Sequence, residues 1–432
     1  MSGVRTPGHN PKLKREAGLL QVVAYGVGNI IGAGIYVLVG DGAGLAGGAL
    51  WISFLIGASV ALFTGLSYAE LSSMYPKDAS EYVYVQKARG GKFWSFLVQW
   101  MMLATEIVAS AAVSLGFADY FQSILPSPPI LVAAILLLAL SLVSIKGVRY
   151  ALKLNFFLSV IAVLGLLVVI FAGAPHIGSM NLTASPNGLE GVIGAAVLVF
   201  FAFIGFDNIA NLGEETKDPH KTLPKGFIIS IALTTVLYVL VGLAAVSLVS
   251  PQQLANSNAP LALAASAALG SGAFDALTAV ALLTTFNTVL VLMITASRII
   301  YGMGREGVLP RAIGKINSGT RTPIVASALA LFGAVLFLPL GRVDIIAEVT
   351  SFGSLISFAM INLALLNLRR IAPHVSRPFK VPLSIGWAPV TAVLGAVSCL
   401  ALLTQFSAFS ASLGILLPLS GALVYALSNH HG

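Results

Sequence analysis

The chain has 432 residues, of which 57% are hydrophobic and only 9% are charged. Soluble globular domains carry about 25% charged residues and cannot bury so large an apolar fraction, so the composition excludes that class. It predicts an all-α integral membrane protein whose helices cross the bilayer many times.

Apolar runs long enough to span a bilayer follow one another along the chain. A helix of about 20 apolar residues crosses the hydrocarbon core. Twelve such runs predict twelve transmembrane helices, at 18–40, 49–74, 93–121, 129–145, 156–173, 191–212, 226–249, 273–297, 323–340, 344–367, 387–405 and 409–428. We therefore expect a cytoplasmic N-terminal segment at 1–17, one transmembrane domain at 18–428 and no soluble domain.

The basic residues predict the orientation of these spans. If the N-terminus is cytoplasmic, every lysine and arginine except Arg342 falls on the inner side, as the positive-inside rule requires. Both termini are then cytoplasmic, and we expect a multi-pass protein of the plasma (inner cell) membrane. The net charge of +8 follows from this topology, so no nucleic-acid partner is expected.

Two connecting segments favour short helices outside the spans. The inner segment 75–92 opens with a proline and continues as an amphipathic pattern, which predicts a helix on the inner face of the membrane. The outer segment 250–272 becomes rich in alanine and leucine, which favours a short surface helix.

The first and sixth spans are interrupted by residues that disfavour a continuous membrane helix. Glycine lowers the cost of unwinding, and Asn or Asp offers polar groups that lipid does not solvate. Unwound backbone at membrane depth is tolerated only where it is buried in protein or lines a cavity. The interrupted stretches are Tyr25-Gly26-Val27-Gly28-Asn29-Ile30-Ile31-Gly32-Ala33-Gly34-Ile35-Tyr36 and Phe200-Phe201-Ala202-Phe203-Ile204-Gly205-Phe206-Asp207-Asn208.

The spacing of the two interruptions predicts an internal repeat. The two interrupted spans are five positions apart in the order of spans, so spans 1 and 6 cross the membrane in opposite senses. Paired breaks of this kind mark the substrate site of transporters built from inverted repeats. We expect a five-plus-five inverted repeat, with halves at about 18–173 and 191–367 and two extra helices at about 387–428.

The broken ends offer opposite partial charges. The second half of span 1 would begin near Gly34 with free N–H groups, which attract a carboxylate, and Gly32 and Ala33 leave room for it. The first half of span 6 would end near Phe203 and leave carbonyls of Phe201, Ala202 and Ile204 free to attract an ammonium group. Together they suit a zwitterionic α-amino acid, although the glycines could also serve only close helix packing.

Three side chains in the spans suggest gating and coupling. Phe201 stands just before the second break, which makes it the candidate gate. Glu106 and Asp207 lie deep in spans, where a charged group costs about 2.5–3.5 kcal/mol and function is the default hypothesis. Burial favours the neutral form of a carboxyl group, so either could carry a proton, and Asp207 could instead bond the unwound backbone.

Other classes of function lack the residues that they need. The single cysteine, Cys399, lies within a span, so we expect neither an intrachain disulfide nor a disulfide-linked subunit. No histidine falls in the middle of a span, so we expect no metal site. No nucleophile–base pair lies at membrane depth, so we expect neither an enzyme nor a cofactor.

A series of short motifs covers most of the chain. They are Gly28-Asn29-Ile30-Ile31-Gly32-Ala33-Gly34, then Phe201 to Asp207 with Gly213-Glu214-Glu215 and Asp218-Pro219, then Tyr301 to Pro310, then Thr322-Pro323 and Ser351-Phe352-Gly353-Ser354. Their order resembles the amino acid–polyamine–organocation superfamily, closest to its cationic amino acid transporter branch. The resemblance implies alternating access around a site at the middle of the membrane.

Residue roles follow from this resemblance position by position. The α-carboxylate would meet the backbone at Ala33 and Gly34, and the α-amino group carbonyls at Ile30, Phe201 and Ile204. Proton-coupled members carry a lysine on the fifth helix, where this chain has Ala162. Asn287 and Thr288 of span 8 would face the same place and could hold a sodium ion or a water.

The sequence therefore predicts a secondary active transporter that moves α-amino acids across a lipid bilayer. Proton-coupled uptake is the first choice, with a proton or a sodium ion as coupling partner. Sodium-coupled symport, amino acid/amine exchange and polyamine transport stay open as alternatives.

Overall fold

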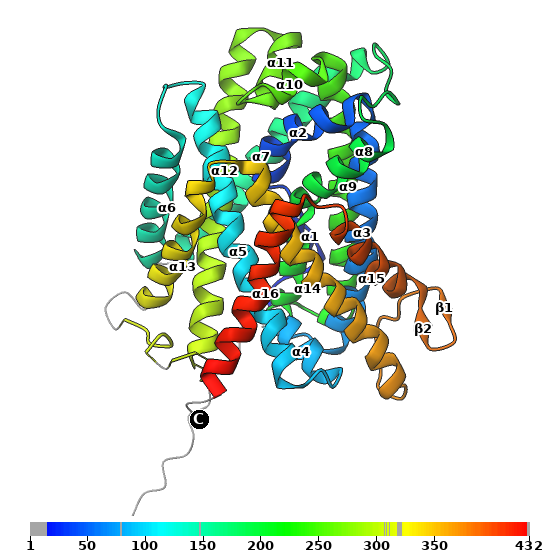
Figure 1. Cartoon of the computed structure of the whole chain (residues 1–432). Helices are drawn as coiled ribbons and strands as arrows, with labels where there is room; N and C mark the ends of the chain where they lie inside the picture. Colours follow the sequence, from blue (N-terminus) through cyan, green and yellow to red (C-terminus); the bar gives the residue numbers. More distant parts are fainter. Residues whose placement is uncertain are drawn as a thin grey trace, which may run out of the picture.

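The computed structural model describes residues 15–77, 80–146, 148–305, 307, 309–310, 312–317 and 322–429. Most of the expected N-terminal segment 1–17, and part of the motif 301–310, lie outside these residues. The described chain is a bundle of long helices (Figure 1).

Most elements are helices, and the longest of them run the length of the bundle. In chain order they are α1 (Leu19–Ile30), α2 (Ala33–Ala46), η1 (Gly47–Ala49), α3 (Leu50–Met74), α4 (Ser80–Lys87), α5 (Gly91–Gln122), α6 (Pro129–Lys146), α7 (Val148–Gly173), η2 (Ala174–His176), α8 (Gly188–Val199), η3 (Phe200–Phe203), η4 (Phe206–Leu212), α9 (Pro219–Leu248), α10 (Pro251–Ala255), α11 (Pro260–Leu269), α12 (Ser271–Arg305), α13 (Ile324–Phe337), η5 (Leu338–Leu340), α14 (Val343–Ile371), α15 (Val390–Leu403) and α16 (Ala408–Asn429). Between α14 and α15 lies a hairpin of β1 (Ser384–Ile385) and β2 (Ala388–Pro389), in which Ser384 pairs with Pro389.

The helical membrane architecture expected from the sequence is confirmed. Among the described residues, eight helices are long and apolar enough to cross a bilayer. Shorter apolar helices, such as α6, α13 and α15, coincide with other expected spans. Span 11 was expected from residue 387, but α15 begins at Val390 because the hairpin occupies the residues before it. The count of twelve spans and the inverted repeat stay predictions.

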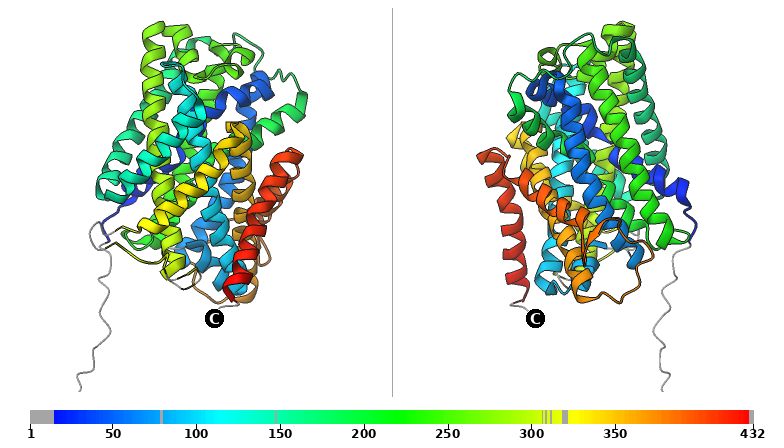
Figure 2. Two further views of the ribbon diagram at one scale, coloured as in Figure 1. Left: turned by 60° about the vertical axis from the view of Figure 1, so that its left-hand side comes forward. Right: turned by 90° about the vertical axis from the view of Figure 1, so that its right-hand side faces the viewer.

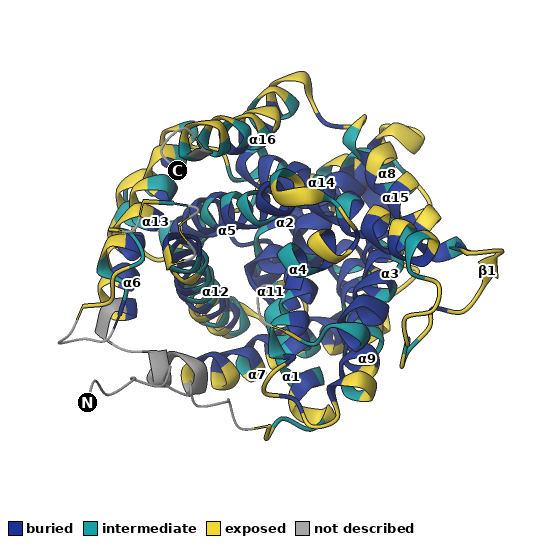
Figure 3. Cartoon of the chain, turned by 90° about the horizontal axis from the view of Figure 1, so that it is seen from below, coloured by how far each residue is buried: buried dark blue, intermediate teal, exposed yellow. Residues whose placement is uncertain are grey.

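The perimeter of the bundle presents apolar side chains to its surroundings. On α6, Leu131, Ile135, Leu138 and Leu142 are all exposed. Figure 3 shows the same contrast from below, with exposed residues on α6, α13 and α16 and buried residues on the inner helices. Apolar side chains outside and polar ones inside suit a lipid environment, where lipid tails solvate the outer surface.

The two ends of the bundle carry different short elements. The helices α10 and α11 cover the upper end, whereas α4, the hairpin and the C-terminal end of α16 lie at the lower end (Figures 1 and 2). The chain preceding α1 joins the lower connections, because Ala17 pairs with Thr216 in a parallel bridge. The expected short helices of segments 75–92 and 250–272 are therefore present, as α4 and as α10 with α11.

Both expected interruptions are real and touch each other. One helix ends at Ile30 and the next begins at Ala33, while α8 gives way to η3 and then to η4. Gly205, between η3 and η4, has a φ of 114°, a backbone conformation that is strained for any residue with a side chain. A Cβ atom added there would also lie 2.7 Å from the Asn29 carbonyl oxygen. The two glycine-containing breaks therefore depend on close backbone contact.

Side chains from other helices satisfy the broken backbone. The Tyr238 hydroxyl of α9 lies 2.8 Å from the Ile30 carbonyl oxygen and 3.0 Å from that of Ala202, so one proton is shared between the two breaks. On α12, the Thr288 hydroxyl oxygen accepts a hydrogen bond from the Ala33 amide (3.1 Å). These contacts stabilise unwound backbone that lipid or apolar side chains would leave unpaired.

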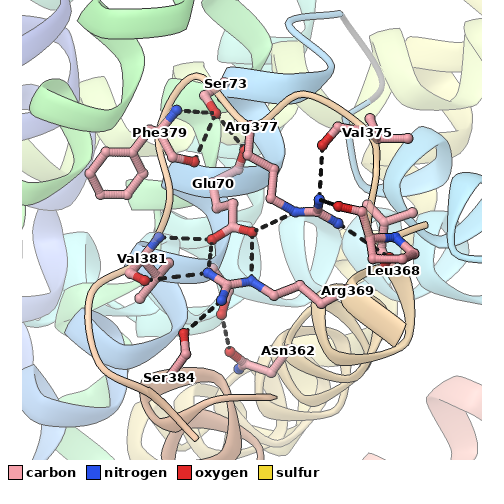
Figure 4. A network of polar contacts seen from close by, with 12 residues as sticks. Glu70, Ser73, Asn362, Leu368, Arg369, Val375, Arg377, Phe379, Val381 and Ser384 are labelled. Carbon is pink, nitrogen blue, oxygen red and sulfur yellow. Dashed lines mark hydrogen bonds and ion pairs between the residues drawn. The ribbon is translucent and has the colours of Figure 1, made fainter. Parts of the chain in front are cut away.

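A buried ion-pair network fastens the lower end of the bundle (Figure 4). Glu70 of α3 is fully buried and bonds Arg369 of α14 through both carboxylate oxygens, and Arg377 approaches it at 3.3 Å. The Val381 amide also donates to Glu70 (2.8 Å). Breaking one side of such a pair leaves a buried charge, so the network ties α3, α14 and the segment before the hairpin together.

We expect Tyr238→Phe to destabilise the protein without changing its shape. The substitution keeps the ring and removes a hydroxyl that donates to a carbonyl of each break. An unsatisfied buried carbonyl costs about 1–3 kcal/mol, so the melting temperature in detergent should fall.

Tyr425→Phe on α16 is the matched control, because its ring packs on Phe93 and Phe96 and its hydroxyl makes no hydrogen bond within the described chain. An equal melting temperature for Tyr238→Phe and the unmodified protein would mean that the Tyr238 hydroxyl does not support the breaks.

Candidate substrate site

A cavity lies where the two interruptions meet. It spans about 770 Å³ of empty space, part of it continuous with solvent. Its walls come from the breaks themselves and from α5, α7, α12 and α14. Glycine, asparagine, glutamate and aspartate border it together with aliphatic residues.

Every residue that the sequence singled out for substrate or coupling borders this cavity. They are Ile30, Gly32, Ala33, Gly34, Glu106, Phe201, Ala202, Ile204, Asp207, Asn287 and Thr288. These positions lie on six helical elements and in the two breaks, and they extend along the chain from Ile30 to Thr288, so only the fold brings them together.

The glycines of the first break have different neighbours. An added Cβ at Gly34 would lie 2.6 Å from the Ala202 Cα atom, so this glycine allows the two broken helices to touch. At Gly32 the added Cβ would meet the Thr288 hydroxyl at 2.8 Å. The close-packing role considered for these glycines is therefore real, and it coexists with their place at the cavity wall.

The carbonyls of the second break are better satisfied than the sequence predicted. We expected those of Phe201 and Ala202 to be free, and this is wrong. The Phe201 carbonyl accepts the Ile204 amide at 3.2 Å, and the Ala202 carbonyl faces Tyr238. The reason is that η3 tightens the end of α8 into a 3₁₀ turn. A carbonyl oxygen has a second lone pair, so each can still accept a bond from a ligand.

Only one of the four aromatic rings at the second break faces the cavity. Phe201 borders it, whereas Phe203 packs on Tyr238 with ring centroids 5.1 Å apart. Phe206 packs on Tyr68, and Phe200 packs on Phe358. The structure thus separates the candidate gate from three rings that belong to the core.

Two carboxyl groups share the cavity. Asp207 is 2% exposed, and its Oδ1 accepts the Gly205 amide (3.1 Å), as the expected contact with unwound backbone requires. Glu106 is 8% exposed and faces the amide of Asn208 rather than backbone. Asp207 therefore bonds the backbone of the break, whereas Glu106 contacts a side chain, that of Asn208.

The expected position of Asn287 opposite Ala162 is wrong. Asn287 donates to Asn155 Oδ1 at 2.7 Å, two helical turns from Ala162. The Ala162 carbonyl instead accepts the Tyr36 hydroxyl at 2.5 Å. Because α7 and α12 run in opposite directions, Ala162 lies level with residues of α12 that precede Asn287.

Several polar residues of the cavity were missed by reasoning from the sequence. Asn155 and Asn208 border it, and so do Thr105 and Ser354. Asparagine inside an apolar run was the signal available for the first two. The hydroxyl residues gave none, because Ser and Thr occur in membrane helices as ordinary backbone-bonded residues. Within the described residues no group of acidic, histidine and cysteine side chains is arranged to hold a metal ion.

Comparisons with known proteins agree with this arrangement. Residues 18–426 match the sequence model of a family described as amino acid permease. The chain is 32% identical to a branched-chain amino acid permease of Bacillus subtilis (strain 168), over 96% of this chain and 93% of the relative. It is 29% identical to a methylthioribose transporter of the same strain, over 90% and 87% of the two chains.

A eukaryotic relative extends the similarity. The chain is 34% identical to the chloroplastic cationic amino acid transporter 9 of Arabidopsis thaliana, over 71% of this chain and 58% of the relative. The superfamily resemblance seen in the motifs is thus confirmed, and the chain is a transporter rather than an enzyme. The chain belongs to the amino acid permease family of the amino acid–polyamine–organocation superfamily.

Proposed function

We propose that this protein carries an α-amino acid across the cell membrane by alternating access around the cavity between the two breaks. One observation carries the proposal: the N-terminal end of α2 and the C-terminal end of η3 border the same cavity. The first end attracts a carboxylate and the second an ammonium group. The distance between those groups in any α-amino acid is fixed, so the backbone can recognise the whole class.

The cavity wall favours a neutral aliphatic side chain. Met102, Val113, Val291 and Leu292 border it together with the carboxyl groups. Apolar walls stabilise an aliphatic side chain in proportion to the area that they cover. The name of the Bacillus subtilis permease supports branched-chain amino acids. A cationic substrate, paired with Glu106 or Asp207, is the alternative.

Glu106 is the proposed coupling residue. It is buried at the cavity, faces Asn208, and lacks the backbone bond that holds Asp207. A carboxyl group in this position can take a proton together with the substrate. Asn287 and Thr288 remain the candidates for a sodium site, and exchange without an ion is the third mode. We further propose both termini on the cytoplasmic side, from the distribution of basic residues.

Uptake by purified protein in liposomes tests the function. We expect labelled leucine, isoleucine or valine to accumulate when the outside is acidic, and labelled lysine to accumulate less. Accumulation that depends on a sodium gradient instead would show that sodium, and not a proton, is the coupling ion. Methylthioribose should be tested alongside these amino acids. If the protein transported methylthioribose and no amino acid, the proposal would be contradicted.

Phe201→Ala tests the gate. We expect uptake to fall several-fold while substrate binding changes less, because a missing gate interrupts closure more than contact. Phe200→Ala is the comparison, since Phe200 is fully buried in the core. That variant should lower the melting temperature more than Phe201→Ala does. Equal losses of transport and stability in both variants would make the gate assignment unspecific.

Glu106→Gln tests coupling. The amide keeps the shape and the contact with Asn208 but cannot carry a proton. We expect accumulation driven by a pH gradient to fall to the level of protein-free liposomes, while exchange of labelled for unlabelled substrate continues. Asp207→Asn should impair both activities, because Asp207 also supports the break. Normal gradient-driven uptake by Glu106→Gln would rule out Glu106 as the coupling residue.

A further inference from the structure

A further buried carboxyl group lies between the cavity and the lower end of the bundle. Glu81 belongs to α4, the short helix at that end in Figure 1, and is 3% exposed. Its Oε1 atom has no hydrogen-bond partner, and Glu81 forms no salt bridge with any described residue. Buried carboxyl groups normally have complete partners or a paired cation, so this one needs an explanation.

Polar side chains join Glu81 to the cavity. The Ser80 hydroxyl lies 2.9 Å from Glu81 Oε2 and 3.2 Å from Asn211 Oδ1. The Asn211 amide donates to Asn208 Oδ1 at 3.5 Å, and Asn208 faces Glu106. A row of polar groups thus connects the proposed coupling residue with Glu81 through η4 and α4, in a region where most neighbours are apolar.

The remaining groups around Glu81 are acids and phenols. From α3, the Tyr68 hydroxyl faces its carboxyl group, although neither that hydroxyl nor Glu81 Oε1 completes a hydrogen bond. Tyr84 lies on the same helix, Asp207 approaches from η4, and Glu106 from α5. Within the described chain, therefore, no cation faces Glu81.

Burial gives Glu81 a proton affinity suited to neutral pH. Loss of solvent, and to a smaller extent the nearby Asp207 carboxylate, together raise its pKa to about 7. The neutral form is therefore favoured below about pH 7, and the carboxylate above it. A group that titrates here can both accept and release a proton at cytoplasmic pH.

We propose that Glu81 is the proton-release site of the transport cycle. The inference rests on the proposed proton-coupled function and deepens it. A proton leaves the Glu106 carboxyl group, whose O–H bond breaks, and a new O–H bond forms on the Glu81 carboxylate. Hydroxyl groups and water carry it between them, while Asn208 and Asn211 keep the route polar. Glu81 then gives the proton to water at the α4 end.

Glu81→Gln in liposomes, with a pH indicator trapped inside, tests this assignment. The amide preserves shape and the contact with Ser80 but cannot bind the proton. We expect substrate-driven acidification of the interior to be lost, together with gradient-driven accumulation. Exchange of labelled for unlabelled substrate should continue, which shows that the variant folds and binds.

Two matched variants complete the design. Glu81→Asp keeps a carboxyl group and should recover part of the proton flux. Glu190→Gln removes an exposed carboxyl group at the start of α8 and should behave as the unmodified protein.

The outcomes separate the two levels of the proposal. Proton flux in the unmodified protein and in Glu81→Gln alike would overturn the role of Glu81 and leave proton-coupled transport standing. No proton flux in the unmodified protein would overturn both. Loss of exchange as well as flux in Glu81→Gln, with no recovery in Glu81→Asp, would assign Glu81 a structural role.

Discussion

The unwound backbone of the two interrupted helices is the constraint on which the rest of this structure depends. Free peptide groups in the middle of a membrane bundle are costly unless protein groups pair with them. Tyr238 meets the carbonyls of both breaks, and Thr288 meets the amide that opens α2. Each break is therefore stable only when α9 and α12 are packed against it, and the cavity exists because that packing leaves space beside the paired groups.

The buried carboxyl groups of the described chain are of two kinds, those paired with an arginine and those without a cation nearby. At the lower end, Glu70 and Arg369 form a fully partnered, buried pair that fixes α3 to α14. Glu106 and Glu81 are equally buried but lack a cation among the described residues. A paired carboxylate holds its charge and the helices around it, whereas an unpaired one gains by binding a proton. The same residue type thus supports the scaffold in one place and suits coupling in another.

Glycine, asparagine and aspartate are conspicuous in apolar runs, so the sequence indicated where the two helices break. All the residues chosen on that basis border one cavity. Reasoning from the sequence failed where the answer depended on neighbours from distant helices. The carbonyls at Phe201 and Ala202 are paired by a local 3₁₀ turn and by Tyr238, and Asn287 meets Asn155 instead of standing opposite Ala162. Which residues of two packed apolar helices lie at the same level cannot be read from either sequence alone.

The sequence by itself determined the membrane class, the places where the helices break and the family to which the chain belongs. Composition, run length and backbone-breaking residues act locally, so each can be read from a short stretch. Only the tertiary structure decided which of four phenylalanines borders the cavity, that Gly34 admits Ala202, and that Glu81 lies at the end of a polar row from Glu106. Those facts depend on contacts between residues far apart in the chain, and such contacts are fixed by the packing of the whole bundle.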